Sequence, residues 1–449
     1  MRVHVRRPLV ALAALCSGLF LSASPARADI YLEAIPGSLD DTARIEAALD
    51  ACSSPAPACT VRLGPGTFHV GLIVAEEFNG AFVGAGMDVT IVKAMPDIPA
   101  NFSLLLPYGK DNRVPNLIGF LGGRVRVADM SIRAEEYHPM QGYAWLPGLP
   151  TTYFLNTLLW FSQKEGGTAP HARVERVELT GSDGDAGLFY GKPLPVGQGV
   201  NVNTLLGFGG LLFNPVVTGG TFEARDVRLH RAIAGFHILR VEDSRITLTD
   251  SVITAAVTGL SGFLASASEI RYERNSVDAW QFGVDVSQPA TLDPEGWIPS
   301  KPSRFAIAGN VLRVAQNMPL VTAGIRAVDD FAGSPGGRRL EAWIANNRIE
   351  ATGPTAMRFG IRLIASEGAQ VINNSIAGTG WAGVFLDYAL GVRIQSTAFS
   401  AFTPGGPAGA PIAHLVFGPH TSDCVAVTVP ISATVIDAGT NNVVRRTAK

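Results

Sequence analysis

The stretch "IANNRIEATGPTAMRFGIRLIASEGAQVINNSIAGTGWAGVFLDY", residues 344–388, contains one pattern twice. An Asn-Asn pair is followed two residues later by an isoleucine, first Ile349 and then Ile376. Each isoleucine is followed by a glycine that opens an alternation of apolar residues, Gly360 and Gly383. A pattern that recurs as a whole indicates an architecture built from similar structural units.

Both landmarks recur at a period near 24 residues. The apolar residue that ends the x-Asn-x-apolar unit recurs with spacings of 24, 24, 35, 37, 27 and 23, at Leu229, Ile253, Val277, Leu312, Ile349, Ile376 and Phe399. The glycine recurs with spacings of 24, 24, 41, 36 and 23, at Gly235, Gly259, Gly283, Gly324, Gly360 and Gly383. Weaker copies of the unit end at Ile132 and Leu179. This period, with short alternating strands and no room for a long helix, predicts a solenoid whose rungs are coils of parallel strands. A propeller blade would need a repeat of about 40 to 45 residues.

Asparagines occupy one position in four consecutive rungs, two residues before the unit-ending apolar residue: Asn275, Asn310, Asn347 and Asn374. Asn tolerates the left-handed conformation needed at a sharp corner, and its amide can bond the backbone and the Asn of the next rung. We therefore predict a structural Asn ladder rather than a ligand site.

The region after residue 28 has the pattern of a capped solenoid. "DDTARIEAALDAC" (40–52) has N-cap candidates at Asp40 and Asp41 and the apolar spacing of a short amphipathic helix. Such a helix would cover the unpaired edge of the first coil. The strand patterns "VRLGPGTFHV" (61–70) and "GAGMDVTIV" (84–92) follow it.

This order of helix and strands, together with the Asn ladder, resembles the pectate-lyase-like superfamily. The resemblance implies an all-β fold, a right-handed single-stranded parallel β-helix with rungs of about 23 to 24 residues and a short N-terminal capping helix. The superfamily includes lyases, hydrolases, epimerases, phage tailspikes and adhesins, so the fold does not choose among activities.

The first 28 residues have the features of a secretory signal: Arg2, Arg6 and Arg7, an apolar run to Phe20, and small residues up to Ala28. We expect an exported chain, periplasmic or extracellular, with no membrane span after signal cleavage, because no later stretch has 18 uninterrupted apolar residues. The mature chain would have 32 basic and 38 acidic residues, a formal net charge of −6 that argues against nucleic acid as a partner. The sequence leaves the oligomeric state open.

Three cysteines follow the signal. In an oxidising compartment Cys52 and Cys59, with six residues between them, are predicted to form a disulfide. Cys424 is predicted to be a small buried hydrophobe. No His or Cys pair accompanies them at zinc-ligand spacing.

Alternation after the landmark glycine predicts a column of outward-facing residues. The first and third residues after the glycine are mostly apolar and should face the core, so the second should face outward. Down the rungs this second residue is His237, Ser261, Asp285, Arg326, Arg362 and Phe385. Like charges about 5 Å apart repel unless something anionic lies between them. Insertions at 287–303 and 329–339 are expected to raise loops beside the column and form a trough.

These side chains suit an acidic polysaccharide. Arginines such as Arg326 and Arg362 pair with uronate carboxylates, and neutralising the carboxylate acidifies the adjacent C–H for β-elimination. His237 is a candidate base, and Asp285 could orient substrate, hold Ca²⁺ or act as an acid/base group. The candidate substrate contacts are Ser261, Phe385, Trp381 and Tyr388. The three aromatic residues could stack on a sugar ring or pack against a loop.

Several motifs of enzymes in this superfamily are absent. Asp329 and Asp330 lack the preceding Asn-Thr-Asp and the following Gly-His-Gly and Arg-Ile-Lys of polygalacturonases. The Tyr-Gly-Phe-Asp-Pro-His stretch of alginate epimerases and the Trp-Ile-Asp-His stretch of pectate lyases are also absent. Inverting hydrolysis needs two carboxylates and the column supplies one, which favours a lyase over a hydrolase. A non-catalytic exported β-helix that binds glycans or serves at the cell surface remains the alternative. In that case the two arginines would only contact carbohydrate or form a solvated pair bridged by Asp285, Asp329 or Asp330.

The predicted organisation runs in four segments: a signal peptide at 1–28, an N-terminal cap at 29–60, the β-helix at 61–430 and a C-terminal end at 431–449. Inserted loops are expected at about 134–170, 182–221, 287–303 and 329–339. The aromatic-rich segment 137–167 is either a binding loop or an apolar wall packed on the coil.

Overall fold

A computed structural model of the chain describes residues 29–53, 58–96, 116–135, 157–181, 209–213, 217–288, 299–315, 321–330, 340–353, 357–403 and 412–447. The predicted signal peptide, most of the aromatic segment 137–167 and most of the expected insertions lie outside these residues.

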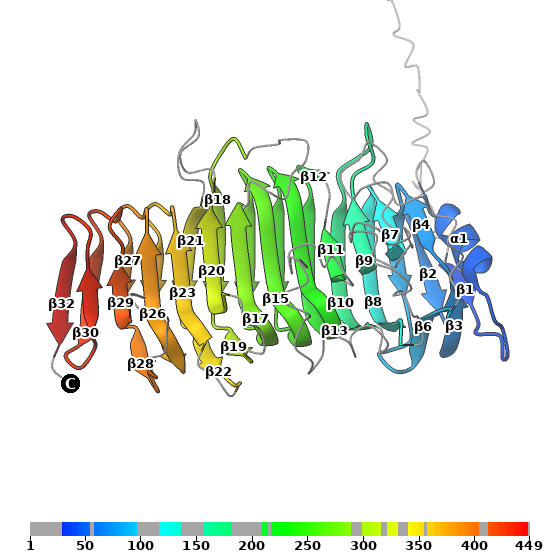
Figure 1. Cartoon of the computed structure of the whole chain (residues 1–449). Helices are drawn as coiled ribbons and strands as arrows, with labels where there is room; N and C mark the ends of the chain where they lie inside the picture. Colours follow the sequence, from blue (N-terminus) through cyan, green and yellow to red (C-terminus); the bar gives the residue numbers. More distant parts are fainter. Residues whose placement is uncertain are drawn as a thin grey trace, which may run out of the picture.

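The described strands form one continuous sheet wound into a coil. Each strand pairs in parallel with the strand one rung further along the chain, as in the pairings of Leu229 with Ile253 and of Ile253 with Val277. The residues that pair are those that the 24-residue period aligns, so the predicted right-handed parallel β-helix is confirmed. In Figure 1 the strands stand side by side along an elongated body, from α1 at one end to β32 at the other.

Each rung has up to three strand segments, and some strands bend through a corner and serve two of them. The strands before the asparagine corner form the first face: β1 Asp29–Leu32, β2 Cys59–Leu63, β5 Asn79–Val83, β8 Arg124–Arg133, β10 His171–Thr180, β13 Thr221–Glu242, β14 Arg245–Thr249, β16 Glu269–Glu273, β18 Ser303–Ala308, β21 Leu340–Ala345, β24 Gln370–Ile372, β27 Arg393–Gln395, β30 Val425–Pro430 and β32 Val443–Thr447.

The strands that begin after that corner form the second face, which is joined by the later parts of β8, β10 and β13: β3 Gly66–Val70, β6 Thr90–Ala94, β15 Val252–Ser266, β17 Ser276–Gln288, β19 Val311–Val314, β22 Arg348–Ala351, β25 Ser375–Ala377 and β28 Ala398–Ser400. The last parts of β13, β15 and β17 continue into the third face, which also contains β4 Ile73–Glu76, β7 Asn116–Leu121, β9 Thr157–Ser162, β11 Gly209–Phe213, β12 Val217–Thr218, β20 Ala323–Asp329, β23 Met357–Ile364, β26 Thr379–Asp387, β29 Ala413–Phe417 and β31 Val435–Asp437.

The inside of the coil is one continuous apolar core. Aromatic rings stack along its axis with centroids 5.2–6.4 Å apart: Phe78, Phe82, Phe120, Phe161, Phe222, Phe236 and Tyr272. The first and third residues after the landmark glycine belong to this core in the rungs of Gly235, Gly283, Gly324, Gly360 and Gly383, as the alternation predicts.

The Asn ladder is present at the corner between the first and second faces. Asn347 Oδ1 accepts bonds from the backbone N–H and the side-chain amide of Asn310, both at 3.0 Å. Asn374 Oδ1 accepts the same pair of bonds from Asn347. All four ladder residues are buried, so these bonds satisfy polar groups that water cannot reach.

The left-handed residue at this corner is not the ladder asparagine, contrary to the sequence argument. It is the residue before it, Arg274 at φ 57°, Gly309 at 65°, Asn346 at 57° and Asn373 at 54°. The ladder position must keep its side chain inside the coil to reach the next rung, so the preceding residue makes the reversal. The two members of each Asn-Asn pair therefore have different roles.

A second ladder, of serines, lies at another corner. Ser244 Oγ accepts the N–H of Gly220, Ser268 Oγ accepts the N–H of Ser244, and Ser303 Oγ accepts the N–H of Ser268. Gly220 and the three serines are spaced 24, 24 and 35 residues apart, the spacings of the main register in the same rungs, so the sequence contained a signal for this stack that the sequence argument did not use.

The ends of the coil are also defined. The predicted helix forms as α1 (Thr42–Asp50) and buries Ile45, Ala48 and Leu49. The predicted Cys52–Cys59 disulfide is present, and Cys424 is buried in the core, where its sulfur accepts the N–H of Val392 at 3.3 Å. At the other end β31 and β32 still pair with β29 and β30, so the coil runs through residues assigned above to a separate end. Among the described residues, no helix is long and apolar enough to cross a membrane.

Candidate functional site

The predicted column is aligned on the outside of the third face. His237 pairs with Ser261, Ser261 with Asp285, Asp285 with Arg326, Arg326 with Arg362 and Arg362 with Phe385. Neighbouring strands lie about 4.8 Å apart, so the two arginines are direct neighbours. We call these six residues the arginine column.

Asp285 and Arg326 form a buried ion pair. Arg326 NH1 lies 2.9 Å from Asp285 Oδ2, and Ser287 Oγ donates to Asp285 Oδ1 at 2.6 Å. The Asp285 side chain is only 3% exposed. Ser261 is buried as well, whereas the column was expected to face solvent. The difference arises because these short side chains lie between the larger ones of adjacent rungs, His237 and Arg326.

Arg362 has no comparable carboxylate. Its guanidinium lies over the ring of Phe359 at 5.4 Å, as that of Arg326 lies over Phe282 at 5.3 Å. Among the described residues, the Nε atoms of both arginines are buried with no hydrogen-bond partner. Burial, followed by repulsion from Arg326, lowers the pKa of Arg362 to about 10, although Asp285, Asp330 and Asp387 act in the opposite direction.

The arginines stand beside a small apolar cluster on the outside of the coil, distinct from the core. It consists of Phe282, Ala323, Phe359, Ala382, Ala413 and Val416. Trp381 and Phe385 pack against it, each with its ring 5.4–5.5 Å from that of Phe359. Arg358 lies over Trp381 at 4.8 Å. Trp381 and Phe385 thus pack against strand residues of this cluster rather than against a loop, and the cluster gives the arginines an apolar floor.

His237 belongs to a different part of the column. Its Nδ1 is bonded to Ser261 Oγ, and its ring contacts that of Phe263 at 5.4 Å. Burial lowers its pKa to about 4, so the imidazole is neutral at pH 7. Three strand spacings, about 14 Å, separate it from Arg326. The structure therefore does not bring this candidate base to the arginine pair.

Asp387 is a polar group that the sequence argument missed. It follows Phe385 by two residues, so the same alternation places it on the outer face. Its Oδ1 accepts the N–H of Tyr388 at 3.0 Å and lies 3.4 Å from Nδ1 of His420. Tyr388 is 47% exposed and stacks on His420 with centroids 4.0 Å apart. Tyr388 thus has a half-exposed ring at the edge of the column, packed on one side against His420 in the turn after β29.

A Ca²⁺ role for Asp285 finds no support in its surroundings. Its carboxylate already accepts bonds from Arg326 and Ser287. In the part of the chain that the structure describes, no group of three or more His, Cys, Asp or Glu side chains could hold a metal ion.

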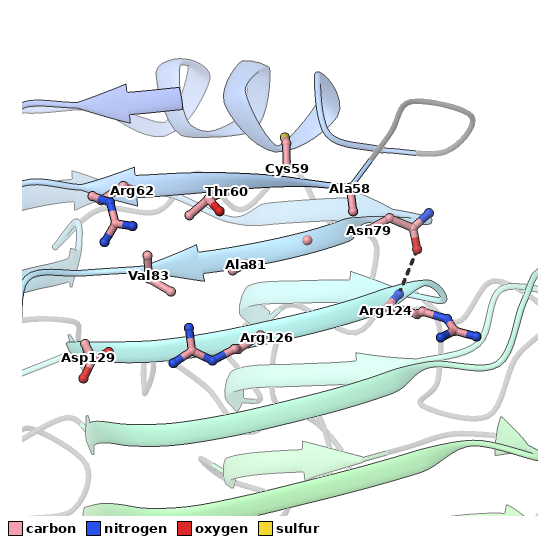
Figure 2. A pocket seen from close by; sticks show the side chains of 11 residues that line it. Ala58, Cys59, Thr60, Arg62, Asn79, Ala81, Val83, Arg124, Arg126 and Asp129 are labelled. Carbon is pink, nitrogen blue, oxygen red and sulfur yellow. Dashed lines mark hydrogen bonds between the residues drawn. The ribbon is translucent and has the colours of Figure 1, made fainter. Parts of the chain in front are cut away.

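Two shallow depressions lie away from the column, on the first face. One, of about 580 Å³, is lined by Arg62, Arg124 and Arg126 around the small residues Gly80 and Ala81. Figure 2 shows Arg62 on β2 and Arg126 on β8, with Val83 of β5 between them. Arg126 is paired with Glu175 at 3.1 Å. The other depression, of about 700 Å³, surrounds Trp343 further along the same face.

Comparison with known proteins gives similarity in solved structures only. No family model and no curated protein sequence matches the chain. The A-module of the Azotobacter vinelandii mannuronan C-5 epimerase is similar with 13% identity, covering 91% of this chain and 96% of that one, at a TM-score of 0.42. DFA-IIIase from Arthrobacter chlorophenolicus A6 without its lid has 12% identity, coverages of 90% and 92% and a TM-score of 0.48. The hyperthermoactive exopolygalacturonase from Thermotoga maritima has 12% identity, coverages of 84% and 93% and a TM-score of 0.46.

Proposed function

We propose that this protein is an exported polysaccharide lyase that binds an acidic glycan along the arginine column and cleaves it by β-elimination. One observation carries the proposal: Arg326 and Arg362 are neighbours, and each has a buried Nε–H without an acceptor among the described residues.

A buried donor without an acceptor costs about 1 to 3 kcal/mol, more when it is charged. Two adjacent guanidinium groups add mutual repulsion, and Asp285 neutralises only one of them. A carboxylate placed against the terminal N–H groups of Arg326 would offset the repulsion, because a guanidinium presents forked donors that match a planar carboxylate; the buried Nε atoms stay out of its reach. The uronate carboxylate is the group on a sugar that fits.

The two arginines differ in a way that suggests separate roles. Arg326 is held by the ion pair with Asp285, so it is positioned to bind and neutralise the carboxylate. Arg362 is the one whose pKa is lowered, to about 10, so its neutral form is reached more readily than that of an ordinary arginine. We assign Arg362 as the base and Asp285 as the residue that positions Arg326.

In the proposed step, neutral Arg362 takes the proton on C5 of the uronate. The C5–H electron pair forms the C4–C5 double bond, the C4–O4 bond breaks, and the leaving O4 takes a proton from solvent. Arg362 then returns its proton to solvent. His237, about 14 Å from Arg326, would contact another sugar of the chain and take no part in this transfer.

The test is an assay of the mature protein on pectate, alginate and hyaluronan, following absorbance near 230 nm for the unsaturated product, with and without a chelator. We expect product from at least one of them, loss of product in Arg326→Ala and Arg362→Ala, and no effect of the chelator. Arg393→Ala, an exposed arginine bonded to Gln395 on the first face, is the matched control and should keep full activity.

Three other outcomes would contradict parts of the proposal. Glycan binding that needs both arginines but yields no product would identify the non-catalytic alternative. Hydrolysis without unsaturation would require a pair of carboxylates and overturn the assignment of Arg362. Binding that is unchanged in the double variant would remove the arginine column from consideration.

A further inference from the structure

Trp343 lies on the outside of β21 and lines the depression of about 700 Å³ on the first face. Its side chain is 42% exposed, while Trp160 is 1% exposed and Trp381 is packed against Phe359. Among the described residues, no ring or cation is found over the indole of Trp343. A large, partly exposed apolar ring in the lining of a depression indicates a contact surface.

The neighbours of Trp343 leave space beside it. In the rung before, the paired residue is Ala306, and in the rung after it is Gln370. Gly368 lines the same depression, and a side chain added there would meet nothing within 4 Å. The indole therefore has a small residue on one side and a hydrogen-bonding amide on the other.

The rim of the depression is polar, with no uncommitted cation among the described residues. Arg304 is paired with Glu341 at 2.9 Å, and Arg245 lies 3.4 Å from Glu269. Glu367 is exposed and has no ion-pair partner in the described part of the chain. Carboxylates and an amide around an aromatic ring accept bonds from sugar hydroxyls, whereas a uronate would meet like charge.

We propose that the depression around Trp343 is a second glycan-binding site, specific for uncharged sugars and separate from the arginine column. The two sites lie on different faces of the coil, one on β21 and the other on β20 and β23. They also have opposite electrostatic character: among the described residues, Arg362 of the arginine column has no ion-paired carboxylate, and Glu367 of the Trp343 site has no ion-paired cation. The site holds its ligand without transforming it, and it does not depend on the function proposed for the column.

The experiment is native electrophoresis of the full mature protein in gels that contain dextran, laminarin or hydroxyethyl cellulose, with polygalacturonate as the acidic comparison. We expect at least one neutral polysaccharide to retard the protein. Trp343→Ala should weaken that binding about tenfold, equivalent to about 1.4 kcal/mol. Trp343→Phe should retain part of it, because a smaller ring still stacks.

Two further variants separate the site from general damage. Ala306→Gln keeps Trp343 but fills the space beside it, and should also weaken the retardation; the residue paired with Trp343 on its other side is already a glutamine, Gln370, so the strand position tolerates it. Tyr31→Ala removes another exposed ring, 53% exposed, and should bind normally. Arg362→Ala should leave neutral-glycan binding unchanged even where it abolishes lyase activity.

The proposal is overturned if no neutral polysaccharide retards the protein or if Trp343→Ala is retarded as strongly as the parent. Sedimentation of the same variants measures the mass of the particle in solution and so tests whether the depression is a contact between two copies of the chain. If Trp343→Ala changes the mass of the particle in solution, the depression is a contact between two copies of the chain and the proposal is wrong.

Discussion

Arginines lie on the outside of both the first and the third face, but in different states. On the first face Arg304 pairs with Glu341 at 2.9 Å, and at the corner where that face ends Arg274 forms two bonds to Asp250, at 2.7 and 3.0 Å. These groups are exposed, and each has its carboxylate in a neighbouring rung. On the third face Arg362 is largely buried beside a second arginine and above an aromatic ring. Water can solvate an exposed arginine that lacks a carboxylate among the described residues, such as Arg62 or Arg124 on the first face, but it solvates a largely buried one poorly, so the third face is where we expect a ligand.

The largest effect should come from replacing the unpaired cation with an apolar side chain of similar length. We expect Arg362→Met to lower kcat/KM on the acidic substrate at least about a hundredfold, since the proposed base is lost. The same change should leave the free energy of unfolding equal or raise it by about 1 to 2 kcal/mol, because a poorly paired buried charge is removed. Urea denaturation and the 230 nm assay measure both. A clear loss of stability with full activity would show that Arg362 is a structural residue like those of the first face.

The next effect concerns the pH dependence of catalysis. Because the pKa of Arg362 is lowered to about 10 and the base must be neutral, kcat/KM should rise about tenfold per pH unit and level off near pH 10. The His237→Gln variant should have the same profile, since His237 is neutral throughout that range. A profile that levels off near pH 6 or 7 would instead assign the base to a histidine or carboxylate.

A stability prediction contrasts the ladder with its neighbour in the same Asn-Asn pair. Asn347→Ala should lower the free energy of unfolding by about 3 kcal/mol, because it leaves the buried N–H of Asn310 and the carbonyl of Ile307 without their bonds. Asn346→Gly should be neutral or slightly stabilising, because Asn346 already has a φ of 57°. Equal losses in both variants would contradict the division of roles within the pair.

Most of the fold followed from the sequence because the period of 24 and the alternation of two are local and repeated. The core residues and the ladder positions depend on those periods, and the helix depends on its own apolar spacing at Ile45, Ala48 and Leu49. The site depended on contacts between rungs of unequal length, such as the ion pair between Asp285 and Arg326, 41 residues apart. No periodicity predicts that Asp285 would be buried by that pair or that His237 would lie too far from it.

One missed feature had a readable signal. Phe282 and Phe359 each stand immediately before a landmark glycine and three residues before the column residues Asp285 and Arg362. An aromatic residue at this position in alternate rungs predicts an apolar column beside the arginine column. This apolar column is the cluster under the arginines. Trp343, in contrast, is one aromatic residue among charged ones, and only the open space around it distinguishes it.

A smaller effect on stability should appear at acidic pH. The pKa of His237 falls from an ordinary 6.5 to about 4 on folding, so the unfolded chain binds a proton in this window and the folded chain does not. The free energy of unfolding should therefore decrease as pH falls from about 6.5 to 4, by up to about 3 kcal/mol from this group. Urea denaturation of the parent and of His237→Gln at pH 7 and pH 4 measures this contribution. It is the loss of unfolding free energy between the two pH values in the parent minus the loss in the variant. An equal loss in both would mean that His237 is protonated in the folded protein.

The smallest effect should come from the paired charges of the first face. Arg173 is 58% exposed and contacts Glu175, which also has Arg126 at 3.1 Å. Arg173→Ala leaves Glu175 with its second partner, so the free energy of unfolding should change by less than about 0.5 kcal/mol, as is usual for exposed ion pairs. Activity on the acidic glycan should not change. If instead this variant weakened glycan binding as much as Arg362→Ala, any positive charge on the coil would be enough to bind the glycan. Whether an arginine is ion-paired would then not tell a glycan-binding face from a solvated one.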